Sequence, residues 1–198
     1  ATQNFTLSVP SSPDGTIKLA RGNAGATTQD ILSVNASGVV SFPATGSFGK
    51  ILQVSQTVIT APVSTTSTSF VTLSGFTASI TPSSASNKVL VIATLNGGGS
   101  SNAFYRLARN GTDTIFLGDA SGVTVQSSAT DAYVNTNSYM HCASIVYLDS
   151  PSSTSSVAYT ITAKCYSGTL YMNGSYNGTN AVYATRSPST ITLMEVAP

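Results

Sequence analysis

Charge is what this chain of 198 residues has least of. Charged residues make up 8% of it, whereas they supply roughly 25% of an average soluble domain. The 8 Lys and Arg and the 7 Asp and Glu leave a formal net charge of +1. Because they stand singly along the chain, no basic stripe is available to follow a phosphate backbone. We therefore expect no nucleic-acid partner.

Long apolar runs are missing as well. The mean hydropathy is +0.17, but Ser, Thr or Asn interrupts every stretch before it reaches the roughly 18 residues that would suggest a membrane helix. We expect no membrane insertion. The chain opens on Ala1 rather than Met, and no charged-then-apolar leader precedes the first strand-like segment. This favours a start that is a cut inside a longer polypeptide.

Reactive side chains are few: one histidine (His141), two cysteines and seven carboxylates. Glycoside hydrolysis needs two carboxylates flanking one bond, but Asp113, Asp119 and Asp131 fall in turn-rich stretches, where aspartate commonly caps its own backbone. One histidine per chain gives no metal-binding spacing within a subunit. We predict no enzyme, no cofactor and no resident metal. Three copies of His141 meeting on a trimer axis would be the remaining way to bind an ion.

Helical periodicity is almost absent, and β-branched and aromatic residues recur in short blocks between turn formers, which indicates an all-β fold. The predicted strands are residues 5–9, 16–20, 30–34, 39–42, 50–60, 69–73, 77–81, 88–95, 103–108, 112–117, 139–148, 157–166, 169–172 and 190–196. This spacing suits a sandwich, jelly roll or barrel. The sharpest turn signal is Asn110-Gly111, because a type I′ hairpin turn needs positive φ at both central residues.

The two cysteines fall on consecutive predicted strands. If residues 139–148 fold back on residues 157–166, one register places Cys142 opposite Cys165. The buried face of that hairpin would comprise Met140, Cys142, Val146, Leu148, Val157, Tyr159, Ile161 and Cys165, as period-two patterning requires. Directly opposed strand residues are slightly too far apart for a disulfide. Buried free thiols are therefore favoured over a bond.

Composition changes near residue 45. Residues 1–45 hold few large apolar side chains, whereas the later part carries most of the Tyr, Phe, Val and Ile. Gly and Pro cluster in residues 43–49, which predicts a boundary there. A segment that cannot bury its own strands needs neighbours, and identical chains around a threefold axis are the simplest source. We predict two parts, residues 1–45 and 46–198.

A resemblance to bacteriophage tail fibres appears along most of the chain. Residues 16–42 (TIKLARGNAGATTQDILSVNASGVVSF) resemble fibre stem segments. Four further pieces look like the C-terminal head of tail fibres and related receptor-binding proteins: SITPSSASNKVLV (79–91), ARNGT (108–112), IVYLDSPSST (145–154) and STITLMEV (189–196).

The resemblance implies a homotrimer, with residues 1–45 as the end of a short β-stem and residues 46–198 as a jelly-roll-like β-sandwich tip. Such a tip attaches the virion to a bacterial surface glycan or outer-membrane component, and the upstream fibre and tail proteins are its other partners. The protein would be made in the host cytoplasm and would end in the virion. The family shares no universal binding motif, so the resemblance assigns no binding residue.

Candidate receptor-binding residues come from composition instead. Residues 166–186 interleave Tyr with Asn, Gly, Ser and Thr, and sugar recognition uses flat rings together with amides and hydroxyls. The candidates there are Tyr171, Asn173, Tyr176, Asn177, Asn180, Tyr183 and Arg186. A second stretch, residues 130–139, adds Tyr133, Asn135 and Asn137. The alternative is that the Asn-Gly pairs are tight turns and the tyrosines pack a trimer interface.

Two other functions remain open. The chain could be a structural trimerisation cap or virion decoration protein without a ligand of its own. It could also be a polysaccharide-degrading fibre, against which the missing carboxylate pairs are the contrary evidence.

Overall fold

The computed structural model divides the chain into two compact units, Ala1–Phe48 (unit 1) and Gly49–Pro198 (unit 2). The structure describes the backbone of residues 4–8, 17–22, 29–34 and 40–41, and residues 50–113, 115–131, 140–175, 182 and 184–198 in full. The division falls three residues after the boundary that composition predicts. Each unit is described by itself.

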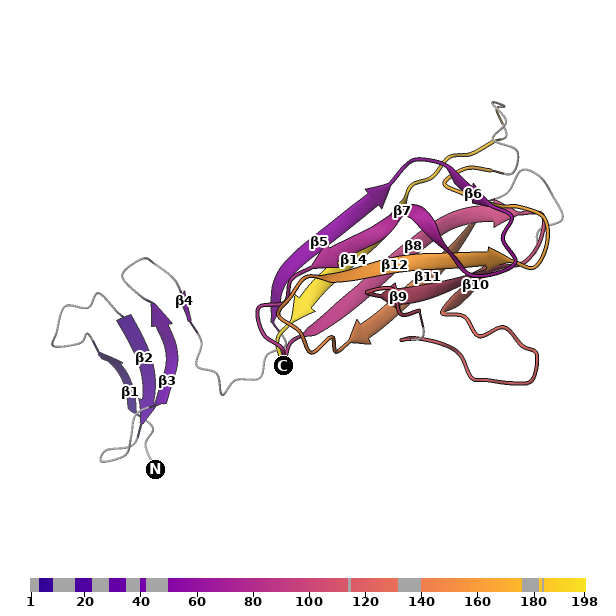
Figure 1. Cartoon of the computed structure of the whole chain (residues 1–198). Helices are drawn as coiled ribbons and strands as arrows, with labels where there is room; N and C mark the ends of the chain where they lie inside the picture. Colours follow the sequence, from indigo (N-terminus) through magenta and orange to yellow (C-terminus); the bar gives the residue numbers. More distant parts are fainter. Residues whose placement is uncertain are drawn as a thin grey trace. The chain divides into compact units, whose positions relative to one another are not determined.

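Unit 1 carries four antiparallel strands that follow one another in the sheet order β1-β2-β3-β4 (Figure 1). They are β1 (Asn4–Ser8), β2 (Ile17–Gly22), β3 (Gln29–Val34) and β4 (Val40–Ser41). A register shift between Leu19 and Ala20 interrupts the pairing of β2 with β3. All four predicted strands of this part are found, with bounds that differ by one or two residues at most ends.

Unit 2 contains two antiparallel sheets stacked as the layers of a β-sandwich (Figure 1). The four-stranded sheet has the order β10-β9-β12-β7. In the six-stranded sheet, β5-β14-β8-β13-β6 follow one another and β11 pairs with β8. The strands are β5 (Ile51–Ile59), β6 (Val63–Thr65), β7 (Val71–Ile80), β8 (Lys88–Gly99), β9 (Ala103–Arg109), β10 (Ala129–Asp131), β11 (His141–Asp149), β12 (Val157–Cys165), β13 (Leu170–Met172) and β14 (Ser189–Val196). The described residues include no helix.

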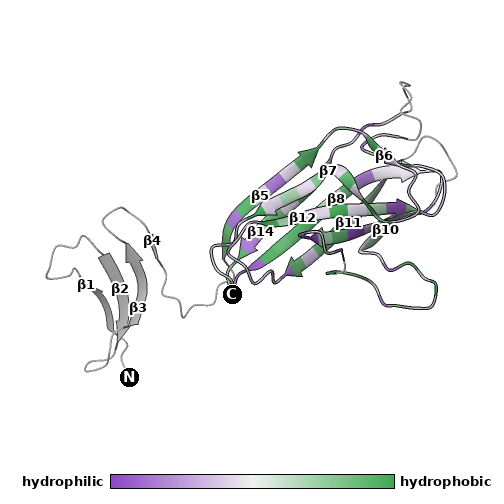
Figure 2. Ribbon diagram, in the orientation of Figure 1, coloured by the Kyte–Doolittle hydropathy of each residue, from purple (hydrophilic) through white to green (hydrophobic). Residues whose placement is uncertain are grey.

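One core fills the space between the two sheets. Buried and less buried residues alternate along β14 and along most of β8 and β12, as strands with one face inward require. Apolar residues accordingly recur along the strands of both layers (Figure 2). The largest fully buried side chains are Tyr105, Tyr159, Phe76, Leu73, Leu95, Leu107, Ile145, Ile161, Leu170, Met172, Ile191 and Leu193.

Strand direction defines two ends of unit 2. β5 begins where the chain enters the unit, and β14 returns antiparallel to it, so that the Ala197 N–H donates to the Lys50 carbonyl at 2.9 Å. We call this the near end; residues 81–87 and 150–156 connect strands there. The opposite end, the far end, carries residues 60–70, 100–102, 131, 140–141, 166–169, 173–175 and 184–188.

The predicted hairpin of residues 139–148 and 157–166 is wrong. β11 pairs with β8 in the six-stranded sheet, whereas β12 pairs with β7 and β9 in the other sheet. The connection between them therefore crosses the sandwich. Cys165 is buried and Cys142 is exposed, and both are free thiols.

The burial predicted for β11 is wrong for the same reason. Ala143 and Ile145 face the core, while Val146 and Leu148 are 57% and 46% exposed. On β12 the prediction holds, because Val157, Tyr159, Ile161 and Cys165 are all buried. Both faces of β11 carry apolar residues, so the period-two pattern did not determine which face points into the core.

Other local predictions have mixed outcomes. Asn110 and Gly111 both have positive φ, 48° and 85°, which confirms the turn. The predicted return strand, residues 112–117, is wrong: the ladder stops at a single bridge between Arg109 and Thr112. The two predicted strands 69–73 and 77–81 are one strand, β7, interrupted by Gly75 at φ 79°. The short strands β6 and β10 were not predicted.

Candidate binding surface

Both candidate segments are anchored at the far end. β13 carries Tyr171, and the segment that follows it returns to the start of β14 just after Arg186. Residues 132–139 connect β10 to β11, whose flanking residues Asp131 and His141 also lie at that end. Seven candidates lie outside the described residues: Tyr133, Asn135, Asn137, Tyr176, Asn177, Asn180 and Tyr183.

Asn173 is a structural anchor. Its side chain is 1% exposed and its backbone is in the left-handed region, at φ 60°. Its N–H donates to the Asn96 carbonyl (2.8 Å), its Nδ2 donates to the Ala61 carbonyl (2.9 Å), and its Oδ1 accepts from Ser189 Oγ (2.6 Å). The fold therefore uses this amide, as the tight-turn alternative expects, and leaves none of it for a ligand.

Two candidates reach the surface: Tyr171 is half-buried and Arg186 is exposed. Tyr171 lies between the buried residues Leu170 and Met172 on β13, so its ring points to the outer side of the six-stranded sheet and is half-buried. Arg186 is exposed and follows Thr185, whose carbonyl accepts from the Ser175 N–H at 3.0 Å. A ring with a hydroxyl and an exposed cation at the same end of unit 2 suit a polar ligand that has both apolar faces and oxygens.

His141 and Asp131 are in contact at the far end, with Nδ1 of His141 3.4 Å from Oδ1 of Asp131. Asp131 belongs to β10 and is buried, so its predicted place in a turn is wrong. The pair holds together the two strands that flank residues 132–139. Among the described residues, no group of three or more His, Cys, Asp or Glu could hold a metal ion.

Sequence reasoning missed a cationic and aromatic group on the outer side of the four-stranded sheet. The Arg106 guanidinium carbon lies 3.9 Å from the Phe70 ring centroid, and Lys164 Nζ lies 5.5 Å from Phe70 and 5.7 Å from Phe104. Cations over ring faces are attracted by the ring quadrupole. Phe104 and Arg106 share one side of β9, and this spacing was the available signal, but the strand that brings in Lys164 was assigned to the wrong partner.

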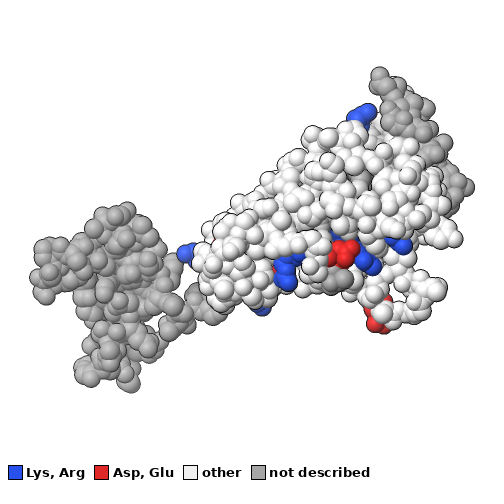
Figure 3. Space-filling model, in the orientation of Figure 1, with Lys and Arg blue, Asp and Glu red and all other residues white. Residues whose placement is uncertain are grey.

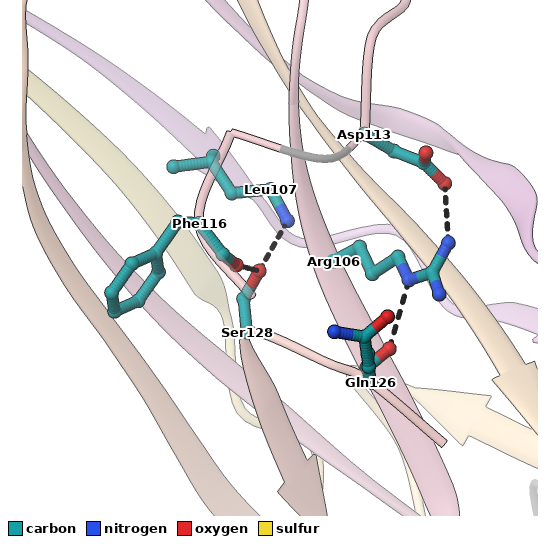
Figure 4. A network of polar contacts seen from close by, with 6 residues as sticks. All are labelled: Arg106, Leu107, Asp113, Phe116, Gln126 and Ser128. Carbon is teal, nitrogen blue, oxygen red and sulfur yellow. Dashed lines mark hydrogen bonds and ion pairs between the residues drawn. The ribbon is translucent and has the colours of Figure 1, made fainter. Parts of the chain in front are cut away.

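Arg106 also fastens the long segment between β9 and β10 (Figure 4). Its Nε donates to the Gln126 carbonyl at 2.9 Å, and its Nη1 lies 3.3 Å from Asp113 Oδ2. Nearby, the Leu107 N–H donates to Ser128 Oγ (2.9 Å), which itself donates to the Phe116 carbonyl (2.5 Å). Most of unit 2 that Figure 3 shows is uncharged, so these ionic contacts are local features of a neutral surface.

Two buried, hydrogen-bonded carboxylates stabilise the near end. Glu195 is 1% exposed, and burial alone would raise its pKa. Hydrogen bonds from Asn87 (2.5 Å), Gln53 (2.6 Å) and both the hydroxyl and N–H of Ser83 (2.7 and 2.6 Å) outweigh burial and lower the pKa to about 2. Asp149 is the second buried carboxylate, and its partners belong to the other sheet. Both groups stabilise the fold.

Comparisons with known proteins place the chain in no family. No protein-family model matches it, and neither does any curated protein. Among solved structures it is similar to a chain in the structure of infectious bursal disease virus, Gx strain, with a TM-score of 0.35 and 16% sequence identity. The match covers 96% of this chain and 48% of that one, so this chain spans about half the length of the viral chain. A similarity of this size assigns no function. No helix in the described ranges has the length and apolarity to cross a bilayer.

Proposed function

We propose that this chain is the end of a homotrimeric bacteriophage tail fibre, with unit 1 as stem and unit 2 as a jelly-roll-like head that attaches the virion to a bacterial surface glycan or outer-membrane component. The head binds and does not catalyse. The observation that carries the proposal is the position of the candidate segments. Both are anchored at the far end, opposite to Lys50, where the chain enters unit 2. A head joined to its fibre at the near end presents the far end to a cell.

The chemistry of the far end supports a glycan or another polar, neutral ligand. Tyr171 and Arg186 offer a ring, a hydroxyl and a cation, and the connections around them are rich in Ser and Thr. A surface with so few charges distinguishes ligands by shape and hydroxyl pattern rather than by long-range attraction. Three weak sites on one trimer, and several fibres on one virion, raise the total avidity by orders of magnitude.

The test is binding of the purified, fluorescently labelled full chain to a panel of bacterial cells and to their purified lipopolysaccharide. We expect Tyr171→Ala combined with Arg186→Ala to weaken binding at least ten-fold. The control Lys88→Ala, an exposed cation at the near end, should leave binding unchanged. If the double variant binds as tightly as the wild type, the far end is not the binding surface.

The same incubations distinguish the other two functions. Binding to none of the cells by a well-folded trimer would favour a trimerisation cap or decoration protein. Shortened polysaccharide chains after incubation would identify a degrading fibre and overturn the non-catalytic proposal.

A further inference from the structure

The outer side of the six-stranded sheet carries a row of apolar residues that crosses four strands. Met194 of β14 lies opposite Val54 of β5 and Leu90 of β8, and Leu90 lies opposite Leu148 of β11. In the next row toward the far end, Ile92 lies opposite Val146 and Thr192, and Thr192 lies opposite Gln56. One row further, Val58 lies opposite Thr190. We call the surface formed by these rows the outer apolar face; its residues are Val54, Val58, Leu90, Ile92, Val146, Leu148 and Met194.

This face is unusually apolar for a sheet surface in contact with solvent. Val54, Val58 and Val146 are 59%, 54% and 57% exposed. On β11 the outward residues Val146 and Leu148 are as apolar as the inward residues Ala143 and Ile145. One side of an antiparallel sheet is commonly polar where water covers it. Contiguous exposed apolar patches mark interaction sites.

The face carries almost no charge, and this selects the kind of partner. The other outward side chains of these four strands are mainly Thr, Ser, Asn, Gln and Cys142, and Lys88 at the near end is the charged one among the described residues. A symmetry axis brings each group close to its own copy, so a charge in the middle of such a face would meet an equal charge. A neutral face avoids this repulsion.

The outer side of these four strands, of which the outer apolar face is the apolar part, has the size of an interface. Four strands spaced about 4.8 Å apart and nine residues long at about 3.4 Å each cover roughly 600 Å² in projection, and side-chain relief increases the accessible area. Specific interfaces bury about 800 Å² on each partner. We infer that the outer apolar face packs against the same face of other copies of this chain. This inference rests on the homotrimer in the proposed function, since three such faces around a threefold axis enclose an apolar core.

Thiol labelling of the full chain tests the inference without disrupting the fold. In a Cys142→Ser background, Val146→Cys places a thiol in the middle of the face, while the second native thiol, Cys165, is 1% exposed and serves as an internal reference. Val123→Cys is the matched control, because Val123 is fully exposed in the segment between β9 and β10. We expect Val146→Cys to react with a maleimide at least ten-fold more slowly than Val123→Cys under native conditions, and equally fast in denaturant.

The solution mass by light scattering completes the experiment. A mass of three chains with a protected Val146→Cys thiol supports both the inference and the proposed trimer. A mass of two chains with the same protection supports the face as the interface and contradicts the trimer. A monomer, or a multimer in which the two thiols react equally fast, overturns the inference. Cell binding is measured separately, so a missing receptor does not affect the result.

A charge placed on the face gives an independent result. Val146→Lys should lower the solution mass or the unfolding temperature of the assembly, whereas Val123→Lys should change neither. If both lysine variants match the wild type in both properties, the face is not an interface.

Discussion

Arg109 and Asp149 join the two sheets of unit 2 at the near end. Nη1 of Arg109, on β9, donates to both carboxylate oxygens of Asp149, on β11, at 2.8 Å. Tyr159 of β12 donates its hydroxyl to the same carboxylate at 2.6 Å. Burial, together with this hydrogen bond, raises the pKa of Tyr159 above its usual range, so the hydroxyl keeps its proton. One carboxylate thus connects three strands from both layers.

We expect Asp149→Asn to lower the free energy of unfolding by about 2–3 kcal/mol, because a buried ion pair loses one charge while Arg109 can turn partly toward water. Urea unfolding followed by tyrosine fluorescence measures the change. Asp119→Asn, in an exposed segment, is the control and should change the free energy by less than about 0.5 kcal/mol. Equal stability of the two variants would show that the pair is not stabilising.

The lowered pKa of Glu195 predicts a pH range in which the folded chain loses stability. Its pKa in the folded chain, about 2, lies below the ordinary value of 4.5, so the unfolded chain takes up a proton at a higher pH than the folded chain. The stability that Glu195 contributes is therefore complete above about pH 4.5 and is lost as the pH falls toward 2. Glu195→Gln should flatten the stability profile in that window and should cost about 2–4 kcal/mol at pH 7, because Gln53 and Asn87 lose a charged acceptor. A profile that keeps the wild-type slope in the variant would assign the loss of stability to other groups.

Gly97 is required by a close approach of strands. A Cβ at this position would lie 2.8 Å from the Tyr171 carbonyl oxygen and 2.7 Å from Met172 Sδ. Gly97→Ala should therefore lower the free energy of unfolding by about 2 kcal/mol, as overpacking does, and should loosen β13. Gly118→Ala, where the nearest atom is 3.9 Å away, is the control. Thermal unfolding of the two alanine variants tests this prediction, and equal unfolding temperatures would refute it.

Arg106 controls how firmly the segment between β9 and β10 is held. Lysine keeps the charge but lacks the planar guanidinium that lies over Phe70 while donating to Gln126. Arg106→Lys should make chymotrypsin cleave after Phe116 or Leu117 several-fold faster. Arg186→Lys, a matched change at an exposed position, should not. Cleavage at the wild-type rate would mean that the contact between Phe116 and Tyr147, whose ring centroids are 4.8 Å apart, is sufficient to hold the segment.

The sequence predicted the features that depend on residues close together in the chain. The all-β class follows from the spacing of β-branched residues, and the Asn110-Gly111 turn follows from its need for positive φ. Strand partners depend on contacts that sequence spacing does not encode. β11 and β12 are neighbours in the chain and lie in different sheets, because a connection of seven residues can cross a sandwich as easily as it can close a hairpin.

Composition selected candidate residues but did not distinguish surface side chains from structural ones. Composition selected Tyr171, which is half-buried, and Arg186, which is exposed. It did not distinguish them from Asn173, whose side-chain amide is hydrogen-bonded to Ala61 and Ser189. The contact between Phe70 and Arg106 could be predicted only by knowing that β12 pairs with both β7 and β9. The outer apolar face was not predicted, for a different reason. Its residues are apolar, and a period-two pattern assigns apolar residues to the core of their own chain rather than to a neighbour.

The position of β14 bears on how unit 2 is made in the cell. This last strand lies between β5, the first strand of the unit, and β8. Pairing of the first strand with the last leaves a loop of more than a hundred residues to be closed, and such non-local contacts slow folding. The six-stranded sheet cannot be completed until β14 has left the ribosome. Until then β5 and β8 have a vacant edge, so an unfinished chain is prone to aggregate or to pair with another nascent copy.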